Sequence, residues 1–170
     1  MGDTPAPVTS AAPDGTGIVL TADALTALTA LLAVEHAAVY ATAAAGGALA
    51  PVGTSADAGR RLAAAAYTAH RELRDELTAL ILGAGAQPPA ALPAYTLPVS
   101  PDTVPGALTL LAELDDRTAA AAFAGVGAVA GPTRALLVDA LTQAAIRAQR
   151  ARLTDRLPVT AAMQPLPGQS

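Results

Sequence analysis

The sequence predicts an all-α protein in which four long helices pack as a bundle. Hydrophobic residues make up 52% of the 170 residues, and most of them are alanine or leucine, whereas aromatic residues make up only 2%. Alanine and leucine favour helices, while β-branched and aromatic residues favour strands. Four stretches also repeat apolar residues at helical spacing, with glycine or proline between them. We therefore expect helices throughout the folded part of the chain.

Charge and cysteine content argue against several classes of protein. The ten basic residues, all arginine, are outnumbered by fourteen acidic residues, so no basic stripe for a nucleic acid is expected. The absence of cysteine excludes disulfides, thiolate zinc sites and cysteine nucleophiles. The N-terminus has no basic segment followed by an apolar one, and the apolar stretch 24–45 carries Glu35 and His36 midway. We expect a soluble, cytoplasmic protein that binds neither nucleic acid nor membrane.

The first helix is expected from Thr21 to the glycine pair that begins at Gly46. Residues 1–20 have no apolar periodicity and predict a disordered tail. Thr21 is a good N-cap. Glu35 falls on the apolar stripe of this helix, where a carboxylate is costly unless it has a partner. The stripe consists of Leu25, Leu28, Leu32 and Val39.

The second helix is expected to be capped by Ser55 and to run to about Leu82. It should lie antiparallel to the first helix because the turn between them is short. His70 interrupts its apolar stripe as Glu35 interrupts that of the first helix. The other members of the stripe are Ala63, Ala66, Leu73, Leu77 and Leu80. Glu35 and His70 are therefore candidates for a shared buried site.

Residues 84–102 are a proline-rich connection. Such a chain extends about 3.1 Å per residue, so this one reaches on the order of 50 Å, which is enough to return the chain to the other end of the bundle. The predicted topology is therefore up-down-down-up. The expected anchors of this connection on the bundle are Leu92, Tyr95, Leu97 and Val99.

The third helix is expected from Thr103 to about Gly125, with Pro105 tolerated in its first turn. The fourth is expected from Pro132 to about Arg152. The predicted organisation is a disordered N-terminal tail at 1–20, a four-helix bundle at 21–153 and a flexible C-terminal tail at 154–170.

Several segments, in the right order, resemble an actinobacterial ferritin-like family of unknown function. The segments are EHAAVY at 35–40, HRELRD at 70–75, PAYTLP at 93–98, ELDDR at 113–117 and DALTQAAIRA at 139–148. The likeness covers about residues 20 to 152 and implies a ferritin-like four-helix bundle.

The wider ferritin-like group binds two metal ions with a Glu from each of two helices and a Glu-x-x-His from each of the others. On that pattern Glu35 and Glu113 match the single glutamates, and His70 matches one histidine. Tyr67 stands where the glutamate before His70 belongs, and the fourth helix has neither Glu nor His. At most three of the six ligands are present, so the resemblance implies at most a reduced site.

Four further residues are expected around this site. His36 points about 100° away from Glu35 around the helix, and Tyr40 lies one turn further along. Tyr67 lies one turn before His70, and Arg147 is the cation that would neutralise Glu35 in the absence of metal.

Two hypotheses about function follow. The first is a non-catalytic structural or interaction module whose polar core is free of metal and any other cofactor. Its function lies in self-association, as a homodimer through alanine-rich helix faces, or in a surface for a protein partner that the sequence does not identify. The alternative is an Fe- or Mn-binding protein or oxidase whose ligands are Glu35, His70 and Glu113.

Overall fold

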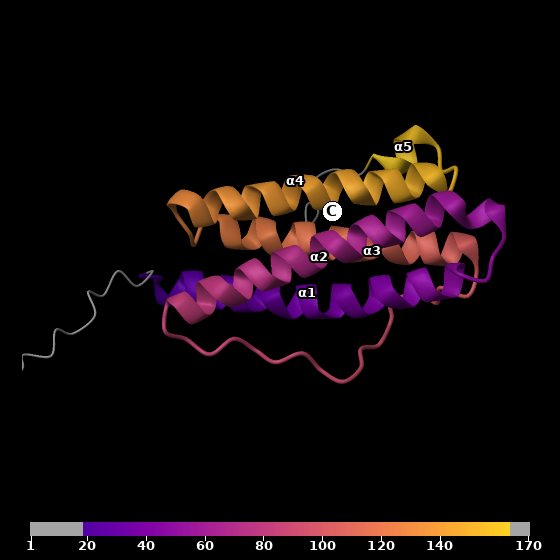
Figure 1. Ribbon diagram of the computed structural model, residues 1–170. Helices are drawn as coiled ribbons and strands as arrows, with labels where there is room; N and C mark the ends of the chain where they lie inside the picture. Colours follow the sequence, from indigo (N-terminus) through magenta and orange to yellow (C-terminus); the bar gives the residue numbers. More distant parts are fainter. Residues whose placement is uncertain (1–18, 164–170) are drawn as a thin grey trace, which may run out of the picture.

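The computed structural model describes residues 19–163, in which four long helices pack side by side as a bundle (Figure 1). No strand occurs within these residues. The prediction of an all-α bundle of four main helices is therefore confirmed. The elements are α1 (Ala22–Leu49), the 3-10 turn η1 (Thr54–Ala56), α2 (Asp57–Gly83), α3 (Val104–Val126), α4 (Gly131–Thr154) and the short helix α5 (Val159–Ala162).

The helix starts follow local capping chemistry. The Thr21 side chain accepts a hydrogen bond from the Ala24 amide at 3.1 Å, as expected for an N-cap. Thr103 caps α3 in the same way, through the Gly106 amide at 3.1 Å. The expected cap at Ser55 was wrong, because this residue lies inside η1 and α2 begins two residues later without a side-chain cap.

The ends of α1 and α4 differ from the sequence expectation. α1 continues through the glycine pair expected to stop it and ends at Leu49, whose side chain is buried in the core. Beyond α4, the chain forms α5, which packs against α4 and buries Ala162. Residues 1–18 and 164–170, which belong to the predicted tails, lie outside the described residues. The predicted flexibility of the tails stays a prediction.

Close approaches at two glycines establish the directions of the helices. A Cβ at Gly59 would lie 3.1 Å from Leu49 and 3.7 Å from Leu108, so the end of α1 meets the starts of α2 and α3. A Cβ at Gly125 would lie 3.2 Å from Ala27, so the end of α3 meets the start of α1. α2 and α3 therefore run in the same direction, and α1 and α4 run in the opposite one (Figure 1).

The crossover, residues 84–103, joins α2 to α3 along the side of α1 (Figure 1). It contains no helix or strand. Nε2 of His36 donates a hydrogen bond to the Pro89 carbonyl at 3.1 Å. The rings of Tyr40 and Tyr95 meet with their centroids 5.6 Å apart. These contacts attach the crossover to the outer side of α1.

Two of the expected anchors pack against the core, namely Leu97 and Val99. Leu92 does not, and its expected role as an anchor was wrong: its side chain is exposed. The crossover contacts the bundle at the alternating positions 95, 97 and 99, as an extended chain does when one face is covered.

The core has two ends of different composition. The leucine-rich end contains Leu28, Leu31, Leu32, Leu77, Ile81 and Leu137, with Ala24, Ala122 and Val129. The alanine-rich end contains Ala41, Ala45, Ala56, Ala63, Ala66, Ala107, Ala112, Ala148 and Ala151, with Leu49, Leu110, Leu111 and Leu114. In each long helix these two sets lie on either side of one position, which is described below.

Among the described helices, α1 alone is long and apolar enough to cross a membrane. Length and composition are weak evidence of a membrane span, because the core helix of a bundle passes the same test. Here α1 packs against α2 and α3.

Candidate functional site

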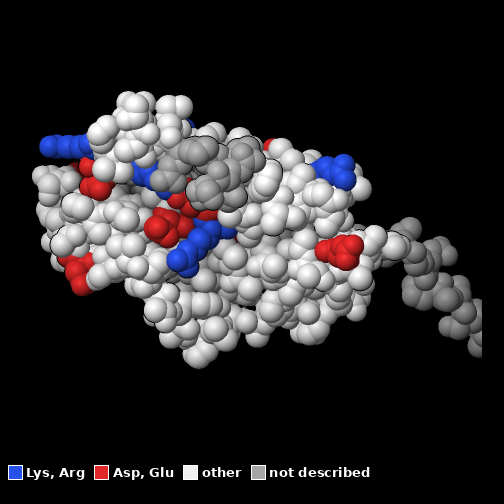
Figure 2. Space-filling model, turned by 180° about the vertical axis from the view of Figure 1, so that it is seen from behind, with Lys and Arg blue, Asp and Glu red and all other residues white. Residues whose placement is uncertain are grey.

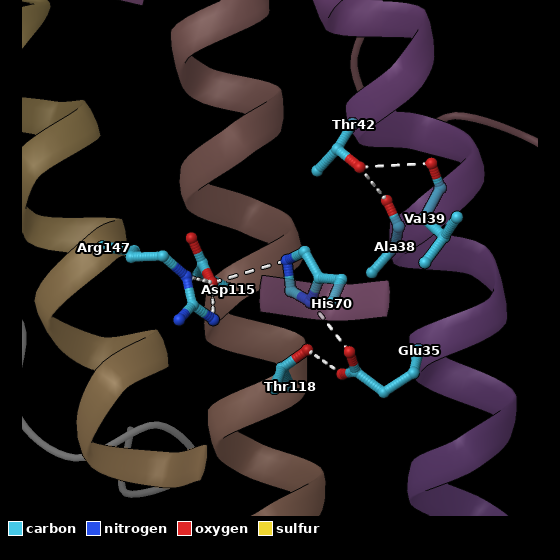
Figure 3. A network of polar contacts seen from close by, with 8 residues as sticks. All are labelled: Glu35, Ala38, Val39, Thr42, His70, Asp115, Thr118 and Arg147. Atoms are coloured by element: carbon cyan, nitrogen blue, oxygen red, sulfur yellow. Dashed lines mark hydrogen bonds and ion pairs between the residues drawn. The ribbon is translucent and has the colours of Figure 1, made fainter. Parts of the chain in front are cut away.

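A layer of polar side chains crosses the bundle between its two apolar ends (Figure 3). Each long helix contributes one member: Glu35 from α1, His70 from α2, Asp115 from α3 and Arg147 from α4. Thr118 of α3 is the fifth member. Glu35 and His70 are 0% exposed and Asp115 is 1% exposed. We call these five residues the polar layer.

The first half of the layer joins α1 to α2. Nδ1 of His70 lies 2.8 Å from Oε2 of Glu35. An ionised carboxylate only accepts hydrogen bonds, so Nδ1 is the donor. The Thr118 hydroxyl donates to the other oxygen, Oε1, at 2.6 Å. Both oxygens of the buried Glu35 are therefore satisfied, as a buried charge requires.

The second half joins α3 to α4. Nε of Arg147 donates a hydrogen bond to Oδ1 of Asp115 at 2.8 Å, and Nη2 forms an ion pair with the same oxygen at 2.7 Å. The Arg147 side chain is 18% exposed, so it lies at the edge of the buried layer. Burial raises the pKa of Asp115 to about 6, although the neighbouring Arg147 and His70 act to lower this pKa.

The two halves meet at the second nitrogen of His70. Nε2 lies 3.5 Å from Oδ1 of Asp115 and finds no hydrogen-bond partner among the described residues. Figure 3 shows the imidazole between the two carboxylates, with Arg147 beyond Asp115. The ring therefore faces a carboxylate on each side.

The carboxylates of the layer outnumber its permanent cation. With His70 neutral, the carboxylates of Glu35 and Asp115 face one guanidinium, which leaves one negative charge unbalanced in the interior. An unpaired buried charge is costly. A proton on Asp115 removes this imbalance, and burial raises the pKa of this carboxyl in that direction.

The structure brings together two of the three predicted site residues, Glu35 and His70. It does not bring Glu113 to them, and this placement corrects the sequence expectation. The Glu113 side chain is 48% exposed, and its carboxylate lies 3.8 Å from Arg117 on the outside of α3. Residues two apart on a helix point about 200° away from each other, so Asp115 points inward where Glu113 points outward.

The four surrounding residues occupy different places. Arg147 joins the layer, but it pairs with Asp115 instead of Glu35. His36 and Tyr40 contact the crossover. Tyr67 contacts Arg71 of the same helix. The guanidinium carbon of Arg71 lies over the tyrosine ring, 5.5 Å from the ring centroid. Of the four, only Arg147 makes a hydrogen bond or ion pair within the polar layer.

Sequence reasoning missed Asp115 and Thr118. A signal was present, because Leu108 and Leu111 set the inward face of α3, and steps of three or four residues along that face reach both positions. By itself, the run Asp115-Asp116-Arg117 predicts a solvated helix face with local ion pairs. This prediction is wrong for Asp115, which is buried.

The residues of the layer do not fit a resident metal ion. A metal needs several donors that converge on one point and a histidine nitrogen with a free lone pair. Here the two carboxylates lie on opposite sides of the imidazole, and Arg147 occupies the outer side of Asp115. No group of three or more His, Cys, Asp or Glu residues within the described part of the chain is arranged to hold an ion.

Fold and site together define a helical-bundle protein whose interior is crossed by a charge layer. The family to which the chain belongs is described as a domain of unknown function, DUF4439, and the match covers residues 27–170. A comparison with curated proteins finds no match.

Among solved structures, the chain is similar to the crystal structure of a conserved hypothetical protein, Rv2844, from Mycobacterium tuberculosis. The two chains share 30% sequence identity and superpose with a TM-score of 0.69. The likeness covers 77% of this chain and 96% of the other. The chain is thus a helical protein of a family that is described without a function, and it has an actinobacterial homologue.

Proposed function

We propose that the protein is a ferritin-like bundle in which a charge layer has replaced the metal centre, and that it acts as a non-catalytic structural or interaction module. The observation that carries this proposal is the position of His70. Its ring lies between the carboxylates of Glu35 and Asp115, and Arg147 supplies the cation on the far side. In this proposal the imidazole of His70 and the guanidinium of Arg147 take the place of the metal ions of a metal-binding bundle.

The helix directions and the crossover support the ferritin-like assignment. α2 and α3 run in the same direction and are joined by a connection along the bundle, which is the plan of bundles with one long crossover. Glu35 and His70 lie in the middle of α1 and α2, at the level where such bundles hold their ligands.

The structural role that we propose for the layer is to align the helices. Each charged side chain of the layer must lie opposite the residue with which it pairs. A shift of one helix by one turn would therefore bury an unpaired charge. The apolar ends alone do not impose this requirement, because alanine and leucine contacts tolerate sliding more readily than ion pairs do. In this proposal the main contribution of the layer is to select one helix register, and its contribution to the free energy of unfolding is secondary.

We further propose that the protein is cytoplasmic and that its surface forms a homodimer. Supporting observations are the small side chains exposed on α1, such as Ala30 and Ala43, which permit close helix approach. The face seen in Figure 2 has acidic and basic side chains gathered near its middle and no continuous basic stripe, which favours a protein surface over a nucleic acid.

Elemental analysis of protein purified without chelator tests the proposal. We expect Fe and Mn far below one ion per chain, and no rise in Tm when Fe²⁺ or Mn²⁺ is added, because a ligand that binds only the folded state would raise it. Near-stoichiometric metal that is lost in Glu35→Gln and kept in Glu113→Gln would overturn the proposal. Glu113 is the matched control, because its carboxylate lies on the outside of α3.

A second experiment tests the aligning role. The variant Glu35→Leu/His70→Leu/Asp115→Leu/Arg147→Met replaces the charges by apolar side chains of similar size, and such replacements are often neutral or stabilising by about 1–4 kcal/mol. We expect it to stay folded but to show broadened NMR resonances from helices in several registers. Sharp, singly populated resonances would contradict the aligning role.

A further inference from the structure

A cavity of about 300 Å³ lies between the crossover and the outer sides of α1 and α3. Its floor is formed by buried Ala38, Ala41 and Leu114. Tyr95 and Leu97 of the crossover form the opposite wall. The cavity is separate from the polar layer, none of whose five members lines it.

The cavity exists because short side chains lie under a chain that is held in place elsewhere. α1 presents Ala37 and Ala41 to it, and these methyl groups do not fill the space below the crossover. The crossover is tied to α1 by the His36–Pro89 hydrogen bond and by the Tyr40–Tyr95 contact, so it is held in position above the alanines. The result is an apolar pocket that is formed before any ligand arrives.

Among the described residues, Arg117 is the only charged one that lines this cavity. Its side chain is 56% exposed, and its nearest acidic partner is Glu113, at 3.8 Å. That distance is longer than a hydrogen bond, so the donors of the guanidinium remain free for a better acceptor. An apolar pocket with one cation at its edge matches a ligand with an apolar body and one anionic end.

We propose that this pocket binds a small amphipathic carboxylate, with its hydrocarbon part between α1 and the crossover and its carboxylate on Arg117. The guanidinium fork suits a carboxylate, with which it can form two parallel hydrogen bonds. The volume is at the lower end of the range for small-molecule sites, which excludes a long acyl chain and suits a short one. This inference does not depend on whether the polar layer binds metal.

Octanoate is the probe, and 1-octanol is its uncharged counterpart. We expect calorimetric titration of the full chain to show saturable octanoate binding that is tighter than octanol binding. Arg117→Gln should weaken octanoate binding about fivefold, as for loss of a half-exposed ion pair, and leave octanol binding unchanged. Glu113→Gln should strengthen octanoate binding about twofold, because it removes the competing carboxylate.

A second pair of variants locates the binding. Ala37→Leu places a larger side chain in the cavity and should abolish binding of both probes. Ala64→Leu makes the same change on the exposed side of α2 and should leave binding unchanged. Circular dichroism of both variants establishes that they are folded. Equal affinities for octanoate and octanol, or octanoate binding that survives Ala37→Leu, would overturn the proposal.

Discussion

The two ends of the bundle core are formed by the same helices but by different side chains. At the leucine-rich end, large side chains from α1, α2 and α4 fill the space between the helix axes. At the alanine-rich end, methyl groups do most of the packing. Burial of a leucine contributes about 1.5–3 kcal/mol, and an alanine contributes far less, so the two ends stabilise the fold by different means. The leucine-rich end depends on the apolar area that it buries, and the alanine-rich end depends on the close approach of its helices.

The polar layer lies at the junction between these ends. A charge network tolerates little misplacement of its groups, because hydrogen bonds weaken steeply with distance and angle. In the aligning role that we propose, the layer sets the helix register from which both apolar ends pack. Four predictions follow from this comparison of the two ends and the layer, in order of decreasing effect.

Removal of the cation from the layer should have the largest effect. Arg147→Met leaves Asp115 buried beside His70 without its main partner, and breaking a buried pair in this way costs about 3–5 kcal/mol. Urea unfolding measures the loss. The control is Arg74→Met, which removes an ion pair with the exposed Asp75 and should cost at most about 1 kcal/mol. Equal losses in the two variants would show that the layer does not behave as a buried network.

Truncation of a buried leucine at the leucine-rich end should have the second largest effect on the free energy of unfolding. Leu77→Ala removes a side chain that is fully buried, and such changes cost about 2–5 kcal/mol. Leu82→Ala, in the next turn of α2 but exposed, should change the free energy of unfolding by less than about 0.5 kcal/mol. Both are measured by urea unfolding. A small loss in Leu77→Ala would mean that this end collapses around the gap.

The third prediction concerns pH. The folded state raises the pKa of Asp115 from 3.8 to about 6, so between these values it binds a proton that the unfolded chain has released. Stability from this group is therefore fully present below pH 3.8 and is lost as the pH rises through 6. Relative to Asp115→Asn, the wild type should lose on the order of 2–3 kcal/mol between about pH 4 and pH 7.

The Asn variant isolates this effect because it leaves the three charged or titratable groups that face Asp115 in place, namely Arg147, His70 and Glu35. Urea unfolding of both proteins across this pH range gives the two profiles. Parallel profiles would show that Asp115 does not carry the proton.

The smallest effect should come from overfilling the alanine-rich end. Ala63→Leu inserts a branched side chain where the helices are close, and overpacking typically costs about 1–3 kcal/mol. The neighbouring Ala64→Leu is exposed and should be close to neutral. Thermal unfolding compares the two. A stabilised Ala63→Leu variant would indicate that this end has unfilled space and that the contrast between the ends is weaker than described.

Much of the fold was predictable because the helices carry strong periodic signals. The four main helices, the N-cap at Thr21, the helix start near Thr103 and the long crossover are local features or follow from chain length. The end of α1 was not predictable from its glycine pair. Burial of Leu49 continues the helix by a further turn, and such tertiary packing is invisible in the local sequence.

The site was predictable only in its first half. Glu35 and His70 each interrupt an apolar stripe, so their burial and their meeting were visible in the pattern. Glu113 was preferred over Asp115 because glutamate matched the ligand type of the resembled group, while the register of α3 favours Asp115. The partner of Arg147 depends on which helix lies beside α4, and a single sequence gives no information on that packing.

The crossover divides the bundle into two helical hairpins, α1–α2 and α3–α4, and each hairpin carries one half of the layer. Glu35 and His70 belong to the first hairpin, and Asp115 and Arg147 belong to the second. The Thr118–Glu35 hydrogen bond and the His70–Asp115 contact join the two hairpins independently of the crossover peptide. A protease cut in the crossover should therefore yield two fragments that still recognise one another, and the gene could be split there into a two-part protein.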